Sequence, residues 1–286
     1  MLNSSVLIIP ASLLVIAFLA SLFLKGKLGV YTYSILSAIA SLFMIYIGLD
    51  VLIHGSSISY TVFSYVAGAL SLGLNRLELV VDPVSAVFLV ALGILGLAVS
   101  MYSLNYLEHY MNKYSLEFFG TTYTLFLASM YMVLTVYNLV WFIIFWELMT
   151  VFSQFLVAYE YRRDIARKAA YKYFFMAKAS SEFIILFILL TLIYLSGFNP
   201  DYLNVKIAIA LIAQQNPLLI AGMFVILLAG LSVKSAIYPL HSWLPDAHSE
   251  APSNISALLS GIMVKMAIYM MVRSFVWFAP PLITLI

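Results

Sequence analysis

The chain alternates long apolar runs with short polar connections along nearly its whole length. A helix needs about 20 apolar residues to cross a bilayer. Runs of about that length occur at residues 5–24, 30–53, 83–104, 117–136, 138–159, 168–197, 217–240 and 252–275. The pattern therefore predicts an all-α polytopic membrane protein with about eight transmembrane helices.

Three other segments do not fit a membrane span. Residues 55–78 are rich in Ser and Tyr and alternate partly with a period of two, which predicts a short hairpin at the membrane surface. The apolar stretch 205–213 follows a turn signal and is too short to cross, so we expect an interfacial helix. Residues 279–286 are also too few to cross, and we expect a tail that lies on a neighbour or in the interface.

The composition supports a membrane location and excludes several functions. Hydrophobic residues make up 64% of the chain and charged residues 9%, whereas soluble domains are about half apolar and a quarter charged. The net charge of +2 forms no basic patch for nucleic acid. The absence of cysteine excludes disulfides, cysteine zinc sites, iron–sulfur ligation and thiol catalysis within the chain. No phosphate loop, haem motif or nucleophile triad is visible, so we expect no catalytic residue and no cofactor here.

Basic residues in the connections predict the orientation. Seven fall on one side and three on the other: Lys25, Lys27, Lys113, Arg162, Arg163, Arg167 and Lys168, against Arg76, Lys206 and Arg273. The positive-inside rule then places the N-terminus outside the cell membrane (or inner membrane) and the 162–168 loop in the cytoplasm. No positive charge precedes the first apolar run, which is the reverse of a signal peptide, so we expect an uncleaved first helix.

Three charged residues, Glu147, Lys234 and Lys265, lie deep inside apolar runs. Such residues are expensive in a membrane and commonly mark an ion path. A carboxylate near mid-bilayer at Glu147 would be protonated, bind a cation or form a structural ion pair between two helices. Lys265 follows Ser260 and Gly261, which leave space for packing and ordered water. Packing explains the small residues but not the lysine.

Lys234 is followed by Pro239. Proline removes a backbone donor and blocks the carbonyl four residues earlier, which belongs to Ser235. We therefore expect a broken seventh helix beside Lys234, and exposed backbone carbonyls are tolerated at membrane depth only where they line a cavity. Snorkelling of Lys234 to the interface is the alternative.

Two histidines follow this break, and histidine can relay protons near neutral pH. His241, closer to Lys234 in the sequence, is the better relay candidate. His248 is equally well explained as a loop histidine with a local hydrogen bond. Together with Asp246 and Glu250 the two histidines superficially resemble a metal site. An intervening proline disrupts any regular spacing, so we expect no metal.

The sixth run carries Lys172, Lys178 and Glu182. Lys172 is close to the cytoplasmic end and can snorkel. Lys178 and Glu182 are spaced i, i+4 and can pair on one helix face, either as a structural pair or as an extension of a polar path. Tyr171 and Tyr173 are typical of an aromatic belt at the interface.

Three segments are recognisable together: FWELMTVFSQFLVAYE, ARKAAYKYFFMAKASS and KSAIYPLHSWLPDAHSEAPSNISALLSGIMVK. They resemble the antiporter-like subunits of respiratory complex I, a family that includes the large subunits of Mrp-type cation/proton antiporters and of membrane-bound hydrogenases. The resemblance covers roughly residues 80–275. The wording of the third segment leans toward the hydrogenase-linked branch.

The resemblance implies roles for several residues. Glu147 in the fifth span would pair with Lys234 in the broken seventh helix, and Lys265 in the eighth span would take the proton onward. His241 matches the family's histidine after the break, and His248 matches the one in the following loop.

The sixth span matches the family only in part. Lys172 matches a family lysine near the start of this span. Lys178 and Glu182 depart from the complex I pattern, which leaves the transported ion, proton or sodium, open.

Family members commonly carry two inverted repeats, and this chain matches one. The resemblance divides it into three leading helices with a surface loop (1–110), a single five-helix repeat (111–278) and a tail (279–286). One repeat supplies only a half-channel. We therefore expect lipid and other membrane subunits as partners, one of them supplying the missing second repeat or the exit path.

The leading hypothesis is an ion-translocating, non-redox subunit of a complex I-like, hydrogenase-like or Mrp-type assembly, with Glu147 and Lys234 as a switchable pair. The alternative is a scaffold that keeps the charges as structural pairs and bridges two pumping modules. A standalone secondary antiporter fits poorly with a single repeat.

Overall fold

A computed structural model of the protein describes residues 3–65, 74–195 and 199–283, with side chains as far as residue 279. Within these ranges eight helical segments are long and apolar enough to cross a membrane, which confirms the all-α polytopic fold. They are η1 with α1 (Ser4–Leu7, Ile8–Phe23), α2 (Gly26–His54), α3 with η2 (Pro83–Tyr106, Leu107–Tyr110), α4 (Leu116–Thr135), α5 (Leu139–Val157), α6 (Asp164–Leu192), α8 (Pro217–Lys234), and α10, η4 and α11 (Ser253–Leu258, Leu259–Met263, Val264–Ile283).

The seventh span is broken, as predicted, but it ends at Lys234 rather than near residue 240. Ala236 has a left-handed φ of 54°, and a helix cannot continue through such a residue. The Ile237 N–H donates to the Ser232 carbonyl (3.0 Å) and the Ala236 N–H to the Val233 carbonyl (3.2 Å). These two bonds form a Schellman motif, which satisfies the last carbonyls of α8. The chain then turns and re-enters a short helix, α9 (Leu244–Glu250).

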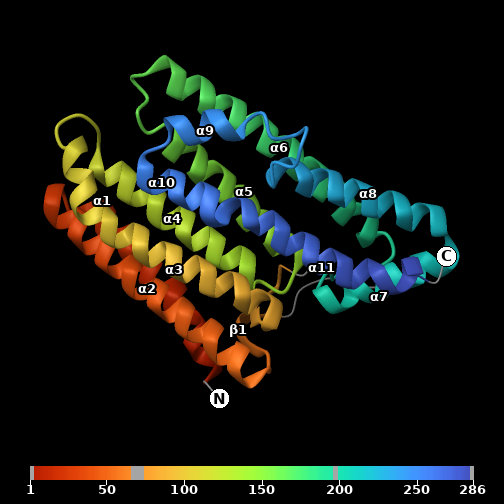
Figure 1. Ribbon diagram of the computed structural model, residues 1–286. Coiled ribbons are helices and arrows are strands. Elements are labelled where there is room, and N and C mark those ends of the chain that lie inside the picture. Colours follow the sequence, from red (N-terminus) through yellow and green to blue (C-terminus); the bar gives the residue numbers. More distant parts are fainter. Residues whose placement is uncertain (1–2, 66–73, 196–198, 284–286) are drawn as a thin grey trace.

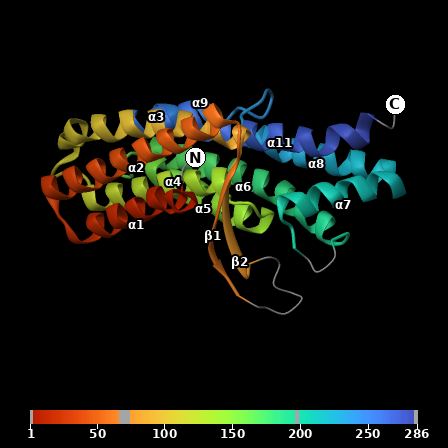
Figure 2. The same cartoon turned by 90° about the horizontal axis from the view of Figure 1, so that it is seen from below.

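The segments between the spans also follow the predicted elements. Strands β1 (Ile58–Ser64) and β2 (Arg76–Val81) form the predicted antiparallel hairpin, which extends from the helical body in Figure 2. Residues 66–73, between the two strands, lie outside the described ranges. Helix α7 (Tyr202–Gln215) occupies the predicted interfacial segment. Helix α11 runs on through Ile283, so the first residues of the expected tail continue the last helix, and residues 284–286 lie outside the described ranges.

Polar residues begin several of these helices where the pattern changes from connection to apolar run. The Asn138 side chain accepts from the Val140 N–H (2.8 Å) at the start of α5, and the Ser115 hydroxyl accepts from the Phe118 N–H (3.1 Å) at the start of α4. Such caps satisfy backbone donors that a helix start leaves unpaired.

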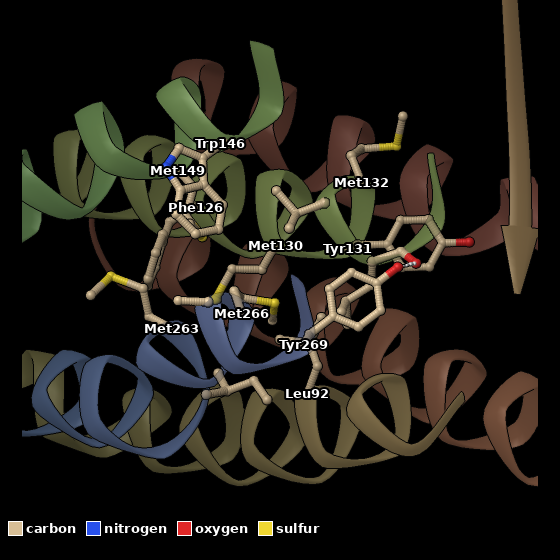
Figure 3. Packing of buried hydrophobic residues seen from close by; sticks show 14 of the residues in the cluster. Leu92, Phe126, Met130, Tyr131, Met132, Trp146, Met149, Met263, Met266 and Tyr269 are labelled. Atoms are coloured by element: carbon tan, nitrogen blue, oxygen red, sulfur yellow. Dashed lines mark hydrogen bonds between the residues drawn. The ribbon is translucent and has the colours of Figure 1, made fainter. Parts of the chain in front are cut away.

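Helix α4 lies at the centre of the bundle and packs against α1, α2, α3 and α5. Of the eight spans it has the largest buried share. Figure 3 shows this core, where Met130 of α4 lies near Met266 of α11 and Tyr131 of α4 lies near Tyr269 of α11. Unbranched methionine fills irregular gaps between helices. In Figure 1, α6 and α8 run side by side, and they are in contact. The buried candidate site around Lys234 lies where this pair meets α5.

Candidate functional site

Lys234, the last residue of α8, is completely buried. Its Nζ donates to Thr150 Oγ1 on α5 (2.8 Å) and to the Tyr173 hydroxyl on α6 (3.0 Å). The ammonium also lies 5.0 Å from the centre of the Tyr173 ring and 5.8 Å from that of Trp146. The side chain therefore does not snorkel. It is held where three helices meet, by neutral hydroxyls and aromatic faces.

Small residues let the helices approach closely enough to make this site. A Cβ on Gly230, one turn before Lys234, would lie 2.7 Å from Phe183 Cβ and 2.8 Å from the Ser180 carbonyl oxygen. The Ser180 hydroxyl also donates to the Gly230 carbonyl (2.6 Å). Glycine at this position therefore sets the α6–α8 spacing that brings Tyr173 to Lys234.

The hydroxyl of Tyr173 connects Lys234 to further groups. It lies 2.7 Å from Ser153 Oγ on α5 and donates to Met263 Sδ (3.3 Å), at the end of η4. Because Met263 is two residues before Lys265, the contact links the Lys234 site to the segment that carries Lys265.

Tyr173 is not part of an aromatic belt, which corrects the expectation drawn from its sequence position. Tyr171 is exposed, but Tyr173 is completely buried. A signal was present, because the small residues Ala166, Ala169 and Ala177 recur with Tyr173 at helical spacing and mark the buried face of α6.

Glu147 does not contact Lys234. Its Oε1 lies 3.2 Å from Lys178 Nζ on α6, in ion-pair contact but without a well-aligned hydrogen bond, and Lys178 also lies 3.7 Å from Glu182 Oε1. Trp146 and Thr150 face the interior, whereas Glu147 lies beside the exposed Leu148 on the other side of α5. This arrangement differs from the direct Glu147–Lys234 pair that the resemblance implies.

Lys265 is half-buried and donates to the Ser260 carbonyl. Ser260 lies in η4, a π-helical turn, and Lys265 follows two residues after the end of that turn. Such turns are frequent at functional sites. His248 on α9 lies nearby: its Nδ1 is 3.0 Å from Ser256 Oγ, one turn before Ser260. Burial, and then the positive charge of Lys265, lower the pKa of His248. The lowered pKa favours the neutral imidazole of His248, which lies within Coulombic range of Lys265.

His241 lies in the turn between α8 and α9 and is exposed. Its ring contacts Tyr238, with the centroids 5.5 Å apart. Of the two histidines, His248 lies near Lys265 of the last span, whereas His241 lies in an exposed turn.

Two ion pairs hold α9 against the loop end of α6. Lys172 Nζ lies 2.7 Å from Asp246 Oδ2, and Arg163 Nη2 lies 3.0 Å from Glu250 Oε2. A cavity of about 260 Å³ opens between the two helices and is lined by Ile165, Lys168, Ala169, Lys172, Asp246, Ser249 and Glu250. The side chains that superficially resembled a metal site thus have separate partners.

The sequence reading missed the cluster around Arg273, which lies inside α11 rather than in a connection. Its guanidinium donates to the Tyr269 hydroxyl (2.6 Å), Ser85 Oγ (2.6 Å) and Asp82 Oδ1 (2.9 Å). Burial alone would raise the pKa of Asp82, but Arg273 and the Ser85 N–H lower it. The cluster ties α11 to the start of α3 and has no contact with Lys234.

Comparisons with known proteins identify the family and the fold of the chain. Residues 136–285, a little over half of the chain, match the family described as "NADH:quinone oxidoreductase/Mrp antiporter, TM". Hydrogenase-4 component B of Escherichia coli (strain K12) is 34% identical over 194 residues. Chloroplastic NAD(P)H-quinone oxidoreductase subunit 5 of Manihot esculenta is 35% identical over 198 residues. Each alignment covers 68% of this chain but only 27% and 26% of those relatives.

Two solved structures share the fold. A chain of the membrane-bound sulfane sulfur reductase, an archaeal respiratory membrane complex, matches with a TM-score of 0.78 and 18% identity, over 96% of this chain and 54% of that one. A chain of the Mrp complex from Dietzia sp. DQ12-45-1b matches with a TM-score of 0.73 and 20% identity, over 96% and 49%. The chain thus spans about a quarter of the curated relatives and about half of the solved chains.

Proposed function

Because this chain belongs to the NADH:quinone oxidoreductase/Mrp antiporter family, we propose that it is an ion-translocating subunit of a multisubunit membrane complex. The observation that carries the proposal is the burial of Lys234 at a helix break, with two hydroxyl partners and, among the residues that the structure describes, no carboxylate in contact. A buried charge without a counter-charge is expensive, and an ionisable residue inside a span commonly marks an ion or proton path, where it changes its protonation state. A side chain that gains and releases a proton meets that requirement.

Glu147 is the group that switches Lys234. The carboxylate lies between two lysines: it contacts Lys178 in this structure, and it is near enough for a Coulombic attraction to Lys234. Turned toward Lys234, it favours the ammonium. Turned toward Lys178, it leaves the Lys234 ammonium with neutral partners only, and Lys234 then gives up its proton more readily.

The released proton passes toward Lys265. The Tyr173 hydroxyl accepts from Lys234 and contacts Ser153, and it also contacts the segment that carries Lys265. Ordered water completes the path. His248, neutral and next to Lys265, accepts and returns a proton at that end; His241, in the exposed turn, exchanges protons with the loop side.

The loop side supplies the protons. The cavity between α6 and α9, with the Lys172–Asp246 pair at its wall, opens beside the helix turn that carries Tyr173. By the positive-inside rule this side is cytoplasmic and the N-terminus lies outside the cell membrane. Lys172 and Asp246 then gather protons at the mouth of a half-channel.

Redox chemistry or a counter-ion gradient in partner subunits drives the switch. The names of the relatives include hydrogenase, quinone oxidoreductase and Mrp complexes. We propose that a partner membrane subunit also supplies the exit path, because the part of the fold described here matches about half of each solved chain.

The test replaces Lys234 by methionine in the whole purified complex. Methionine keeps the approximate volume, and the two hydroxyls retain partners, because Thr150 Oγ1 also donates to the Trp146 carbonyl and Tyr173 also contacts Ser153. Replacement of a buried charge by an apolar residue of similar volume is commonly tolerated. We therefore expect normal assembly and a loss of proton uptake in proteoliposomes, with Lys206→Met on α7, an exposed position, as control.

The result also decides between transport and a scaffold role. A scaffold would keep full transport per assembled complex in Lys234→Met. The same outcome in Glu147→Gln would remove the switch from the proposal and leave Lys234 without its controlling group.

A further inference from the structure

Two charged side chains at mid-span depth, Lys178 and Glu182, are exposed at the surface of the bundle, and a third, Glu147, is partly exposed beside them. The exposed fraction of the side chain is 25% for Glu147, 42% for Lys178 and 63% for Glu182. Lys178 is fourteen residues from each end of α6, or about 21 Å at a rise of 1.5 Å per residue. Glu182 is one turn further along. Neither side chain is near a helix end from which it could reach the interface.

The charged residues belong to a continuous stripe on α6. Tyr171, Phe175, Lys178, Glu182 and Leu186 recur at intervals of three or four residues, and every one of them is half-buried or exposed. Such spacing places side chains on one face of a helix. We call this stripe, with Glu147 of α5, the α5–α6 outer face.

Lipid is an unsuitable cover for this face. Charged side chains in transmembrane segments almost always face protein or a water-filled cavity, because hydrocarbon offers them no partner. Lys178 is shared by two carboxylates, at 3.2 Å and 3.7 Å, so the cluster carries one negative charge in excess when all three groups are ionised. The more exposed carboxylate, Glu182, has only the longer of these contacts.

We propose that the α5–α6 outer face binds a transmembrane helix of a second, different polypeptide, and that this helix places a lysine or arginine against Glu182. One positively charged lysine or arginine side chain would neutralise the excess negative charge. The aromatic and aliphatic members of the stripe, Phe175 and Leu186, would pack against the apolar part of that helix on either side of the ion pair.

A second copy of this chain is a poor occupant. Two copies joined through this face around a twofold axis would bring the same acidic cluster together, and like charges repel strongly at low dielectric. The complementary charge must therefore come from a different surface. The inference depends on the membrane location of α5 and α6, and not on proton transfer at Lys234.

Photo-crosslinking in the intact membrane complex identifies the occupant. A benzophenone amino acid replaces Phe175, or Phe183, an exposed aromatic one residue beyond Glu182. The expected result is a crosslink to a membrane-spanning peptide of another polypeptide that has Lys or Arg within about one helical turn of the crosslinked residue. Crosslinks to lipid alone, to a second copy of this chain, or to a segment without a base would each overturn the proposal.

A charge exchange then tests the ion pair itself. Glu182→Lys should lower the recovery of the crosslinked partner about tenfold or more, and exchange of the partner's base for Glu should restore it. Asp164→Lys is the matched control, because Asp164 is an exposed acid on the same helix but at its loop end. Unchanged recovery in Glu182→Lys, or a loss that the reciprocal change does not rescue, would refute the ion pair. Loss of transport with intact partner recovery would concern the proposed function only.

Discussion

Replacement of Tyr173 by phenylalanine tests how the buried ammonium is held. The change removes the hydroxyl that accepts from Lys234 Nζ at 3.0 Å but keeps the ring, whose centre lies 5.0 Å from that atom. Lys234 retains its bond to Thr150. Ser153 retains a partner in the Met149 carbonyl, at 2.6 Å. The substitution thus deletes one hydrogen bond to a charge, together with the weaker contacts of the same hydroxyl with Ser153 and Met263.

The magnitude follows from the kind of bond that is lost. A hydrogen bond to a charged group contributes about 1.5–3 kcal/mol, which is a factor of about 10 to 150 in an equilibrium. The attraction between the ammonium and the ring, roughly 0.5–2 kcal/mol, is largely kept. We expect the population of the state in which Lys234 is protonated and bound in the site to fall by that factor. Proton uptake by the complex in proteoliposomes should then fall at least about tenfold.

The control is Tyr123→Phe on α4. Tyr123 is equally buried, and its hydroxyl lies 2.7 Å from Ser100 Oγ, a neutral partner remote from Lys234. Its loss should lower thermal stability by the smaller amount typical of a neutral bond, about 0.5–1.5 kcal/mol, without a change in transport. If Tyr173→Phe and Thr150→Val both transport like the unmodified complex while Lys234→Met does not, the two hydroxyls do not hold the transported proton.

Two further predictions concern packing and pH. Gly230→Ala should lower the thermal stability of the detergent-solubilised complex by about 1–3 kcal/mol, because the new Cβ meets Ser180 and Phe183 between α6 and α8. Gly222→Ala on α8 is the control: nothing lies within 4 Å of its Cβ, so the change should be neutral or slightly stabilising. Equal effects of the two substitutions would refute the close approach of α6 and α8 at Gly230. Since the pKa of His248 is lowered in the folded state, its contribution to stability is present above the unfolded pKa near 6.5 and is lost as pH falls through the folded value. Thermal unfolding followed between about pH 7.5 and 5 should therefore show a smaller acid-induced loss in His248→Gln than in His109→Gln, an exposed control.

The spans were predictable because each depends on a local property, a run of apolar residues long enough to cross a bilayer. The break after Lys234 was predictable in the same way, from one proline. Its form was not: the left-handed residue of the Schellman motif is Ala236, and alanine carries no signal for that conformation in the way glycine does.

The partners of the buried lysine depend on packing between helices that are distant in the sequence. Thr150 and Tyr173 are 84 and 61 positions from Lys234, and neither residue type marks an ion site by itself. Whether Glu147 contacts Lys178 or Lys234 depends on how α5 is rotated against α6. Spacing along one helix cannot supply that rotation, so the motif suggested Lys234, whereas the structure shows a contact with Lys178.

The position of Lys178 connects the site to the surface of the bundle. Glu147 and Glu182 compete for this one ammonium, at 3.2 Å and 3.7 Å. On the proposed mechanism, a basic residue of the partner that pairs with Glu182 would remove one competitor and leave Lys178 to Glu147, which would draw the Glu147 carboxylate away from Lys234. Withdrawal of that basic residue would have the opposite effect. Since a ligand shifts an equilibrium only by its differential affinity for the two states, a base that contacts Glu182 alone can still bias the charge around Lys234. A partner helix that moves at the α5–α6 outer face would then change the proton affinity of Lys234 without contacting Lys234.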